Sequence, residues 1–257
     1  MIGHLIYGAG PTRVLVLHGW LGAWTVFQAM TPALDPAAFT FAFMDVRGYG
    51  RSKDQAGPYD MATIASDALA LADGLGWETF AVVGHSMGGK AALRLAVDQP
   101  ARVDRILALT PVWAGAAPFD APTRDLFFGA VQDRGLRAAI IDNTTGGRHP
   151  KAWSNAMAER SAADSTEAAF EQYARSWIDD DFEAAARNIG QEVLVVAGQH
   201  DAGVTEDAVR ATWLAQLPNA RLEVLEGAGH YPMIEAPLAL AGIFERFLSK
   251  DRMYRPD

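Results

Sequence analysis

The chain has 257 residues, of which half are apolar, and it carries a formal net charge of −9. This length can bury one full core, so a single α/β domain with an insertion is expected. The acidic balance, without a basic run, argues against a nucleic-acid or anionic-membrane partner. The chain has no cysteine, which excludes disulfides, thiol catalysis and cysteine-based metal sites.

The N-terminal residues lack a basic region ahead of a long apolar segment. No later stretch reaches the ~18 uninterrupted apolar residues of a membrane-spanning helix. We therefore expect a soluble, cytoplasmic protein with no membrane partner.

The first half of the chain alternates apolar runs with helical periodicity. The runs predict an edge strand over 2–7 and buried strands over 13–17, 39–44, 80–83 and 103–109. Apolar residues at helical spacing predict helices over 61–75 and 87–96. This alternation predicts a mostly parallel, doubly wound α/β sheet with right-handed crossovers.

The segment between Thr110 and Glu192 is far longer than the ~30 residues of a whole βαβ unit. Its patterns predict helices over 121–134, 136–143, 151–160, 166–177 and 180–188. We therefore expect residues 113–189 to form a helical cap over the carboxyl ends of the strands. Residues 1–112 and 190–257 would form the core domain, with further strands over 193–197 and 221–225 and helices over 206–217 and 238–248.

One serine stands where a strand turns into a helix. The apolar run of the strand stops at Gly84, and the helical pattern begins at Met87, directly after Ser86. Such a turn strains the backbone of its central residue and needs small neighbours, which Gly84 and Gly88 provide. It also presents the hydroxyl at a helix N-terminus, which favours developing negative charge. A chance pattern is the alternative, and the strand–turn–helix context favours a nucleophile.

An acid and a histidine follow the ends of two later strands, at the same edge of the sheet as Ser86. A serine hydroxyl needs a base, and His230 can accept its proton and return it to the leaving group. A carboxylate such as Asp201 fixes the tautomer of that histidine. His200 is the rival base, but its adjacency to Asp201 makes simultaneous contact awkward.

Several other residues are candidates for the site or its surroundings. The glycines around Trp20 allow a sharp turn that points its backbone N–H into a cleft. Trp20, Phe127 and Phe128 are candidates for an apolar pocket wall, although most aromatic residues of the cap are expected in its own core. Asp45 and Arg47 are interpreted as structural, holding a loop by charge-assisted hydrogen bonds.

The elbow sequence and the chain order Ser86, Asp201, His230 resemble the α/β-hydrolase fold family. The resemblance covers essentially the whole chain and places the cap after the sixth-strand position of that family. It is specific for fold and triad, and poorly specific for substrate. The matching segments are Gly84-His85-Ser86-Met87-Gly88, His18-Gly19, Asp45-x-Arg47-Gly48-x-Gly50-x-Ser52, Gly198-x-x-Asp201 and Gly229-His230 with Glu235-x-Pro237.

Two departures from other members narrow the implied chemistry. Dehalogenases and epoxide hydrolases of the family have an aspartate where this chain has Ser86, and the glycine run of lipases is missing. The loop around Trp20 is similar instead to that of smaller esterases, perhydrolases and lactonases. The resemblance thus implies hydrolysis of a small-to-medium ester or lactone without cofactor or metal, with the oxyanion held by the N–H groups of Trp20 and Met87.

Three alternatives stay open at this point. A carbon–carbon bond hydrolase and a perhydrolase use the same three residues. A ligand receptor with vestigial hydrolase activity can also keep this fold. The sequence leaves the oligomeric state and the physiological substrate undetermined.

Overall fold

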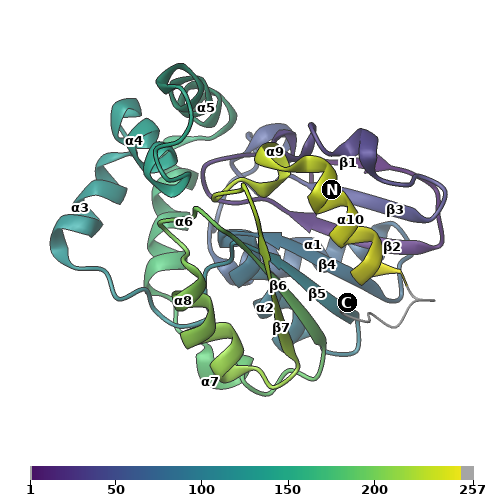
Figure 1. Ribbon diagram of the computed structural model, residues 1–257. Coiled ribbons are helices and arrows are strands. Elements are labelled where there is room, and N and C mark those ends of the chain that lie inside the picture. The colour runs from purple at the N-terminus through teal and green to yellow at the C-terminus, as the bar shows by residue number, and fades with distance from the viewer. Residues whose placement is uncertain (1, 250–257) are drawn as a thin grey trace.

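A computed structural model describes residues 2–249 of the chain (Figure 1). Residues 1 and 250–257, which the sequence analysis assigned to the core domain, lie outside the described residues. The described chain forms a seven-stranded sheet of order β1-β3-β2-β4-β5-β6-β7. Strand β1 pairs with β3 antiparallel, and every other neighbouring pair is parallel. The predicted fold class is confirmed.

The strands lie close to the predicted runs, and the central ones are buried along nearly their whole length. Burial on both sides arises because helices cover both faces of the sheet, which explains why these strands read as continuous apolar runs. The strands are β1 (His4–Tyr7), β2 (Thr12–Leu17), β3 (Phe39–Met44), β4 (Phe80–His85), β5 (Val103–Leu109), β6 (Glu192–Gly198) and β7 (Ala220–Leu225).

Helices α1 (Met61–Gly74) and α2 (Met87–Asp98) lie on one face of the sheet, and α10 (Pro237–Leu248) lies on the other (Figure 1). Short helical turns complete the connections. They are Trp24–Phe27, Thr31–Ala33, Gly50–Ser52 and α9 (Pro232–Glu235). Helix α8 (Glu206–Val209) continues as one π-helical turn, Arg210–Leu214. None of the helices within residues 2–249 is long and apolar enough to cross a bilayer.

The chain leaves the sheet between β5 and β6 and forms the inserted helices. These are α3 (Ala121–Gly129), α4 (Arg134–Thr144), α5 (Lys151–Asp164), α6 (Glu167–Asp179) and α7 (Glu183–Ala186). In Figure 1, α3, α4 and α5 lie at one end of the sheet, the same end as α6. The predicted sixth-strand position of the family thus corresponds to β5 of this chain, and the insertion follows that strand.

Two predicted helices of the insertion were wrong in extent. The helix predicted over 121–134 ends at Gly129, because Asp133 starts a new helix by accepting the N–H groups of Gly135 and Leu136. The helix predicted over 180–188 is reduced to one turn, α7.

The parallel register brings the carboxyl ends of the strands to one edge of the sheet. Leu17 at the end of β2 pairs with Gly84 near the end of β4, and Gly198 at the end of β6 pairs with Leu225 at the end of β7. The loops that follow these strands therefore emerge together. This edge carries Ser86 and the other two residues of the predicted triad.

Candidate active site

Ser86 occupies the turn between β4 and α2 with φ 53° and ψ −117°, a conformation that few residues with a side chain adopt. Its neighbours leave no room for larger residues. A Cβ atom on Gly84 would lie 2.3 Å from the carbonyl oxygen of Gly88, and one on Gly88 would lie 2.5 Å from that of Leu17. The Ser86 N–H donates to the carbonyl of Leu109 at 2.9 Å, which holds the strained turn on β5.

The three predicted residues are brought together by this turn and the two later loops. His230 Nε2 lies 3.0 Å from Ser86 Oγ, and His230 Nδ1 lies 2.6 Å from Asp201 Oδ2. The Asp201 side chain is fully buried, and 10% of the His230 side chain is exposed. A carboxylate only accepts, so Nδ1 carries the proton and Nε2 presents its lone pair to the serine hydroxyl. This geometry suits proton transfer from Ser86 to His230.

Asp201 is held in place by its own loop. Its Oδ1 accepts the N–H groups of Gly203 at 2.8 Å and Val204 at 2.9 Å, while Oδ2 faces His230. Both oxygens are thus engaged, and the carboxylate cannot turn away from the imidazole. His230, and not the rival His200, is the histidine in contact with both Ser86 and Asp201.

The carbonyl of His230 is bound by two residues near Ser86. It accepts from His85 Nε2 at 2.8 Å and from Thr110 Oγ1 at 3.1 Å. Burial, reinforced by the neighbouring His230, lowers the pKa of His85 well below its usual value, so His85 is neutral at physiological pH. Its Nε2–H therefore donates to the His230 carbonyl, and the residue before the serine supports the histidine.

The loop after β2 passes close to Ser86. A Cβ atom on Gly19 would lie 3.1 Å from the Cβ atom of Ser86. The next residue, Trp20, is fixed at both ends, because its carbonyl accepts from the Tyr49 hydroxyl at 2.9 Å and its indole Nε1 donates to the Phe170 carbonyl at 2.7 Å. The Trp20 and Phe170 rings also stack, with centroids 4.0 Å apart. This holds the Trp20 backbone beside Ser86.

A cavity of about 220 Å³ opens at Ser86 and His230. It is walled by the loop after β2, by the start of the insertion, by α3, α4 and α6, and by α8 with the turn that follows it. The larger lining side chains are Trp20, Leu21, Val112, Trp113, Phe119, Phe127, Ile140, Trp177, Val204, Val209 and Tyr231. Among the described residues that line it there is no Lys, Arg, Asp or Glu.

Of the three pocket residues predicted from the sequence, two line the cavity and one does not. Trp20 and Phe127 line the cavity, whereas Phe128 is not among its lining residues. Phe128 lies instead near the guanidinium groups of Arg124 and Arg175, 5.6 and 4.8 Å from its ring centroid. Consecutive residues of a helix point about 100° apart, so only one of the two phenylalanines can face the cavity.

Other lining residues were missed by sequence reasoning. Trp113, Phe119 and Trp177 were recognised only as aromatic residues of the cap, whose own core was the expected place for most of them. Val209 and Thr212 lie in a core helix whose pattern gave no sign of a cavity. No sequence signal distinguished the cavity-facing side of these helices from the packed side.

Asp45 and Arg47 have the structural roles predicted for them. Asp45 is buried and accepts the N–H groups of Trp24 at 2.8 Å and Arg51 at 3.0 Å. Arg47 forms a two-pronged ion pair with Asp67, at 2.7 and 2.9 Å. Within residues 2–249, no group of three or more His, Cys, Asp or Glu side chains is arranged to hold a metal ion.

The fold and this arrangement of side chains define an α/β hydrolase. The sequence model of the alpha/beta hydrolase fold family matches residues 12–237. The chain therefore belongs to that family, and the protein is a hydrolytic enzyme.

Individual relatives act on different substrates. The pimeloyl-[acyl-carrier protein] methyl ester esterase of Stenotrophomonas maltophilia (strain R551-3) is 27% identical over 256 residues, covering 95% of both chains. The 2-hydroxymuconate semialdehyde hydrolase of Pseudomonas putida is 30% identical over 222 residues, covering 80% of this chain and 75% of the relative. The solved structure of an esterase from Exiguobacterium antarcticum superposes with a TM-score of 0.86 at 21% identity, covering 96% of this chain and 95% of that chain.

Proposed function

We propose that the protein is a serine hydrolase that cleaves an uncharged carboxylic ester of small to medium size through an acyl-enzyme on Ser86. The observation that carries this proposal is the continuous line of contacts from Ser86 Oγ through His230 to Asp201, of which Ser86 and His230 line a mostly apolar cavity. The similarity along nearly the whole chain to a methyl ester esterase supports the reaction type.

In the proposed first step, Ser86 Oγ attacks the ester carbonyl carbon and its proton passes to His230 Nε2. Asp201 stabilises the imidazolium that forms. The oxyanion would be held by the backbone N–H groups of Met87, the first residue of α2, and Trp20. Each such donor contributes about 3–4 kcal/mol to lowering the barrier.

The imidazolium of His230 then protonates the leaving alcohol oxygen, and departure of the alcohol completes the acyl-enzyme. In the second half of the reaction, a water molecule attacks the acyl carbonyl carbon and gives a proton to His230, which returns it to Ser86 Oγ as the carboxylic acid leaves. One proton acceptor therefore serves both halves, with Asp201 holding it in the required tautomer.

The cavity supports an uncharged substrate. Among the described residues, its lining is mostly aromatic and aliphatic and holds no Lys, Arg, Asp or Glu, so a charged acyl group would enter without a counter-ion and lose its hydration. A volume of about 220 Å³ lies below the usual range for drug-sized ligands, which favours short or medium acyl chains. We infer that residues 113–189, the inserted helices with their flanking loops, serve as the cap that covers this substrate, over a core of 1–112 and 190–257.

The test is the hydrolysis of p-nitrophenyl esters from acetyl to octanoyl by wild type and Ser86→Ala. We expect the substitution to lower kcat by a factor on the order of 10⁶, because the nucleophile is lost, while the circular dichroism spectrum stays unchanged. Ester hydrolysis retained at the wild-type rate in Ser86→Ala would overturn the assignment.

Carbon–carbon bond hydrolysis is a second candidate, favoured by the similarity to the Pseudomonas putida 2-hydroxymuconate semialdehyde hydrolase. The same serine and histidine would act on a ketone carbonyl. Assaying a 1,3-diketone beside the ester series separates the two. Turnover of the diketone without turnover of any ester would favour this candidate.

A further inference from the structure

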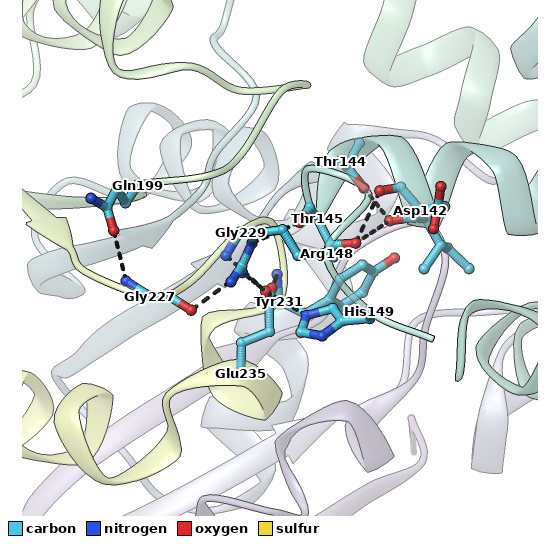
Figure 2. Close-up of polar contacts among 11 residues, drawn as sticks. Asp142, Thr144, Thr145, Arg148, His149, Gln199, Gly227, Gly229, Tyr231 and Glu235 are labelled. Carbon is cyan, nitrogen blue, oxygen red and sulfur yellow. Dashed lines mark hydrogen bonds and ion pairs between the residues drawn. The ribbon is translucent and has the colours of Figure 1, made fainter. Parts of the chain in front are cut away.

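Glu235, the last residue of α9, is a polar group enclosed next to the site. Its side chain is 2% exposed, and Figure 2 shows it pointing into the loop that carries His230. Its Oε2 accepts the N–H of Gly229 at 2.9 Å, and its Oε1 accepts the N–H of Tyr231 at 2.9 Å. One carboxylate thus binds the residues on both sides of His230.

The N–H of His230 itself is bound from the opposite direction. It donates to the carbonyl of Thr144, the last residue of α4, at 3.1 Å. The three consecutive N–H groups from Gly229 to Tyr231 therefore bind Glu235, Thr144 and Glu235 in turn, and none of these bonds belongs to the sheet. Glu235 and Thr144 thus hold the N–H side of the main chain at His230, while His85 and Thr110 hold its carbonyl.

The same carboxylate also contacts the segment that follows α4. Arg148 Nη2 donates to Glu235 Oε2 at 2.6 Å, and His149 Nε2 lies 2.9 Å from that oxygen (Figure 2). Arg148 in addition donates to the carbonyls of Thr145 at 3.1 Å and Gly227 at 3.2 Å. Arg148 thus bridges the inserted helices and the loop that carries His230.

The two segments are in direct main-chain contact at this point. A Cβ atom on Gly229 would lie 2.8 Å from the Cα atom of Thr145 and 3.1 Å from the carbonyl oxygen of Thr144. A shift of the end of α4 would therefore move the loop beside His230. The carboxylate is hydrogen-bonded to that loop and to Arg148 and His149, which follow α4.

We propose that Glu235 is a positioning residue of the hydrolytic reaction, which sets the main chain on both sides of His230 and connects that placement to the inserted helices through Arg148. The inference rests on the proposed serine mechanism. Proton transfer needs the histidine within hydrogen-bond reach of Ser86, and a displacement of about 1 Å is enough to slow such a step roughly 100-fold.

The chemistry of the carboxylate explains why glutamate is required here. A carboxylate only accepts hydrogen bonds, and all of its partners at this site are donors. A glutamine of the same shape would turn an NH₂ group towards at least one of these donors. One flanking N–H, or the guanidinium of Arg148, would then lose its acceptor and move away.

The first experiment compares the ester kinetics of Glu235→Gln with those of wild type, well below the melting temperature of either. We expect kcat to fall by roughly 10- to 100-fold, with a smaller change in KM, because His230 and Tyr231 are the only described residues that line the cavity from the loop that Glu235 holds. The matched control is Glu226→Gln, the same chemical change at an exposed position of the same loop. It should keep the wild-type kcat.

The second measurement needs no substrate. The proton between His230 Nδ1 and Asp201 Oδ2, atoms that lie 2.6 Å apart, should give a downfield resonance in the proton NMR spectrum. We expect Glu235→Gln to shift or broaden this resonance and Glu226→Gln to leave it unchanged. A residue that only adds stability would lower the melting temperature without moving this signal at lower temperature.

Arg148→Met tests the connection to the inserted helices while leaving both backbone bonds of Glu235 in place. We expect a smaller, several-fold loss of kcat. The double variant Glu235→Gln, Arg148→Met should lose less than the product of the two single losses, because both changes affect one carboxylate, although Arg148→Met also removes the bonds to Thr145 and Gly227.

Three outcomes decide the proposal. A folded Glu235→Gln with the wild-type kcat and an unmoved His230 resonance would overturn it. If Glu235→Gln does not fold, an unchanged kcat in Arg148→Met would overturn the connection to the inserted helices. No ester turnover by the wild type would overturn the proposed function instead, and the NMR comparison would still decide whether Glu235 places His230.

Discussion

Hydrogen bonds hold both carboxylate oxygens of Asp201, and its orientation therefore determines which nitrogen of His230 carries the proton. Its Oδ1 is held by the N–H groups of Gly203 and Val204, and its Oδ2 faces Nδ1 of the imidazole. An asparagine could keep these two backbone bonds only by turning its NH₂ group towards His230. The imidazole would then place its proton on Nε2, which faces Ser86.

We therefore expect Asp201→Asn to lower kcat by about 10⁴-fold, because a protonated Nε2 cannot accept the proton of Ser86. Steady-state kinetics with the best p-nitrophenyl ester would measure the effect. A loss below tenfold would show that another acid serves His230.

Phe127 lines the cavity from α3. Its ring packs at 5.1 Å from that of Phe119 and 5.4 Å from that of Trp177, between ring centroids. Replacing it with alanine opens space that a longer acyl chain can fill. Phe128 provides a matched control because it is the next residue on the same helix and does not line the cavity.

We expect Phe127→Ala to raise the ratio of kcat/KM for the octanoyl ester to that for the acetyl ester by roughly tenfold, a typical effect of a change in apolar pocket contacts. Phe128→Ala should leave this ratio unchanged. Equal shifts in both variants would mean that loosening of α3 alone, and not cavity size, sets the preference.

One buried lysine of helix α2 binds the segment before α3 and the end of α6. Lys90 Nζ donates to the carbonyls of Gly115 at 2.9 Å, Trp177 at 3.1 Å and Asp180 at 2.6 Å. Gly115 lies before α3, and the other two lie at the end of α6, where a cation is favoured by the helix dipole. The helix that follows Ser86 thus anchors the insertion.

Lys90→Met would leave three carbonyl groups without this donor. We expect a loss of about 1–3 kcal/mol in the free energy of unfolding at pH 7, measured by urea denaturation. A variant as stable as wild type would show that the better burial of methionine offsets the lost hydrogen bonds.

The stability difference between wild type and Lys90→Met is also expected to depend on pH. Burial lowers the pKa of Lys90 from 10.5 to about 8, against the opposing effect of Asp180 and its acidic neighbours. Between these values the unfolded chain holds a proton that the folded chain has lost, so stability rises with pH. The stability of wild type relative to Lys90→Met should therefore increase from pH 8 towards pH 10.5. A decrease would mean that the three carbonyls favour the charged lysine more than burial opposes it.

For the whole molecule, the sequence predicted the sheet and the proximity of Ser86, His230 and Asp201 because the physical causes are local. Buried strands show as apolar runs, and the strained turn at Ser86 requires small residues at fixed positions. Parallel strands then bring Asp201 and His230 to the same edge as Ser86 without further information. The break between α3 and α4 was predicted at residue 135 and lies over 130–133, although Asp133 is a residue type that favours helix starts.

The features that the sequence did not predict depend on contacts between distant segments. Whether Phe127 or Phe128 faces the cavity is decided by how α3 packs on α6, and neither residue carries that information alone. Glu235 was recognised within a matching segment, but its contact with Arg148 required the end of α4 to lie against the loop around His230. Periodicity gives no access to such pairings.

The bond from the Trp20 indole to the Phe170 carbonyl of α6 has a consequence for how this scaffold can diversify. Together with the bond from His230 to Thr144, it attaches both sides of the reacting centre to the insertion. A chimera that receives the insertion of a relative would bring new partners to Trp20 and His230 along with a new pocket. We therefore expect exchange of this segment to change the rate of the chemical step as well as the choice of substrate, unless the graft keeps these two contacts.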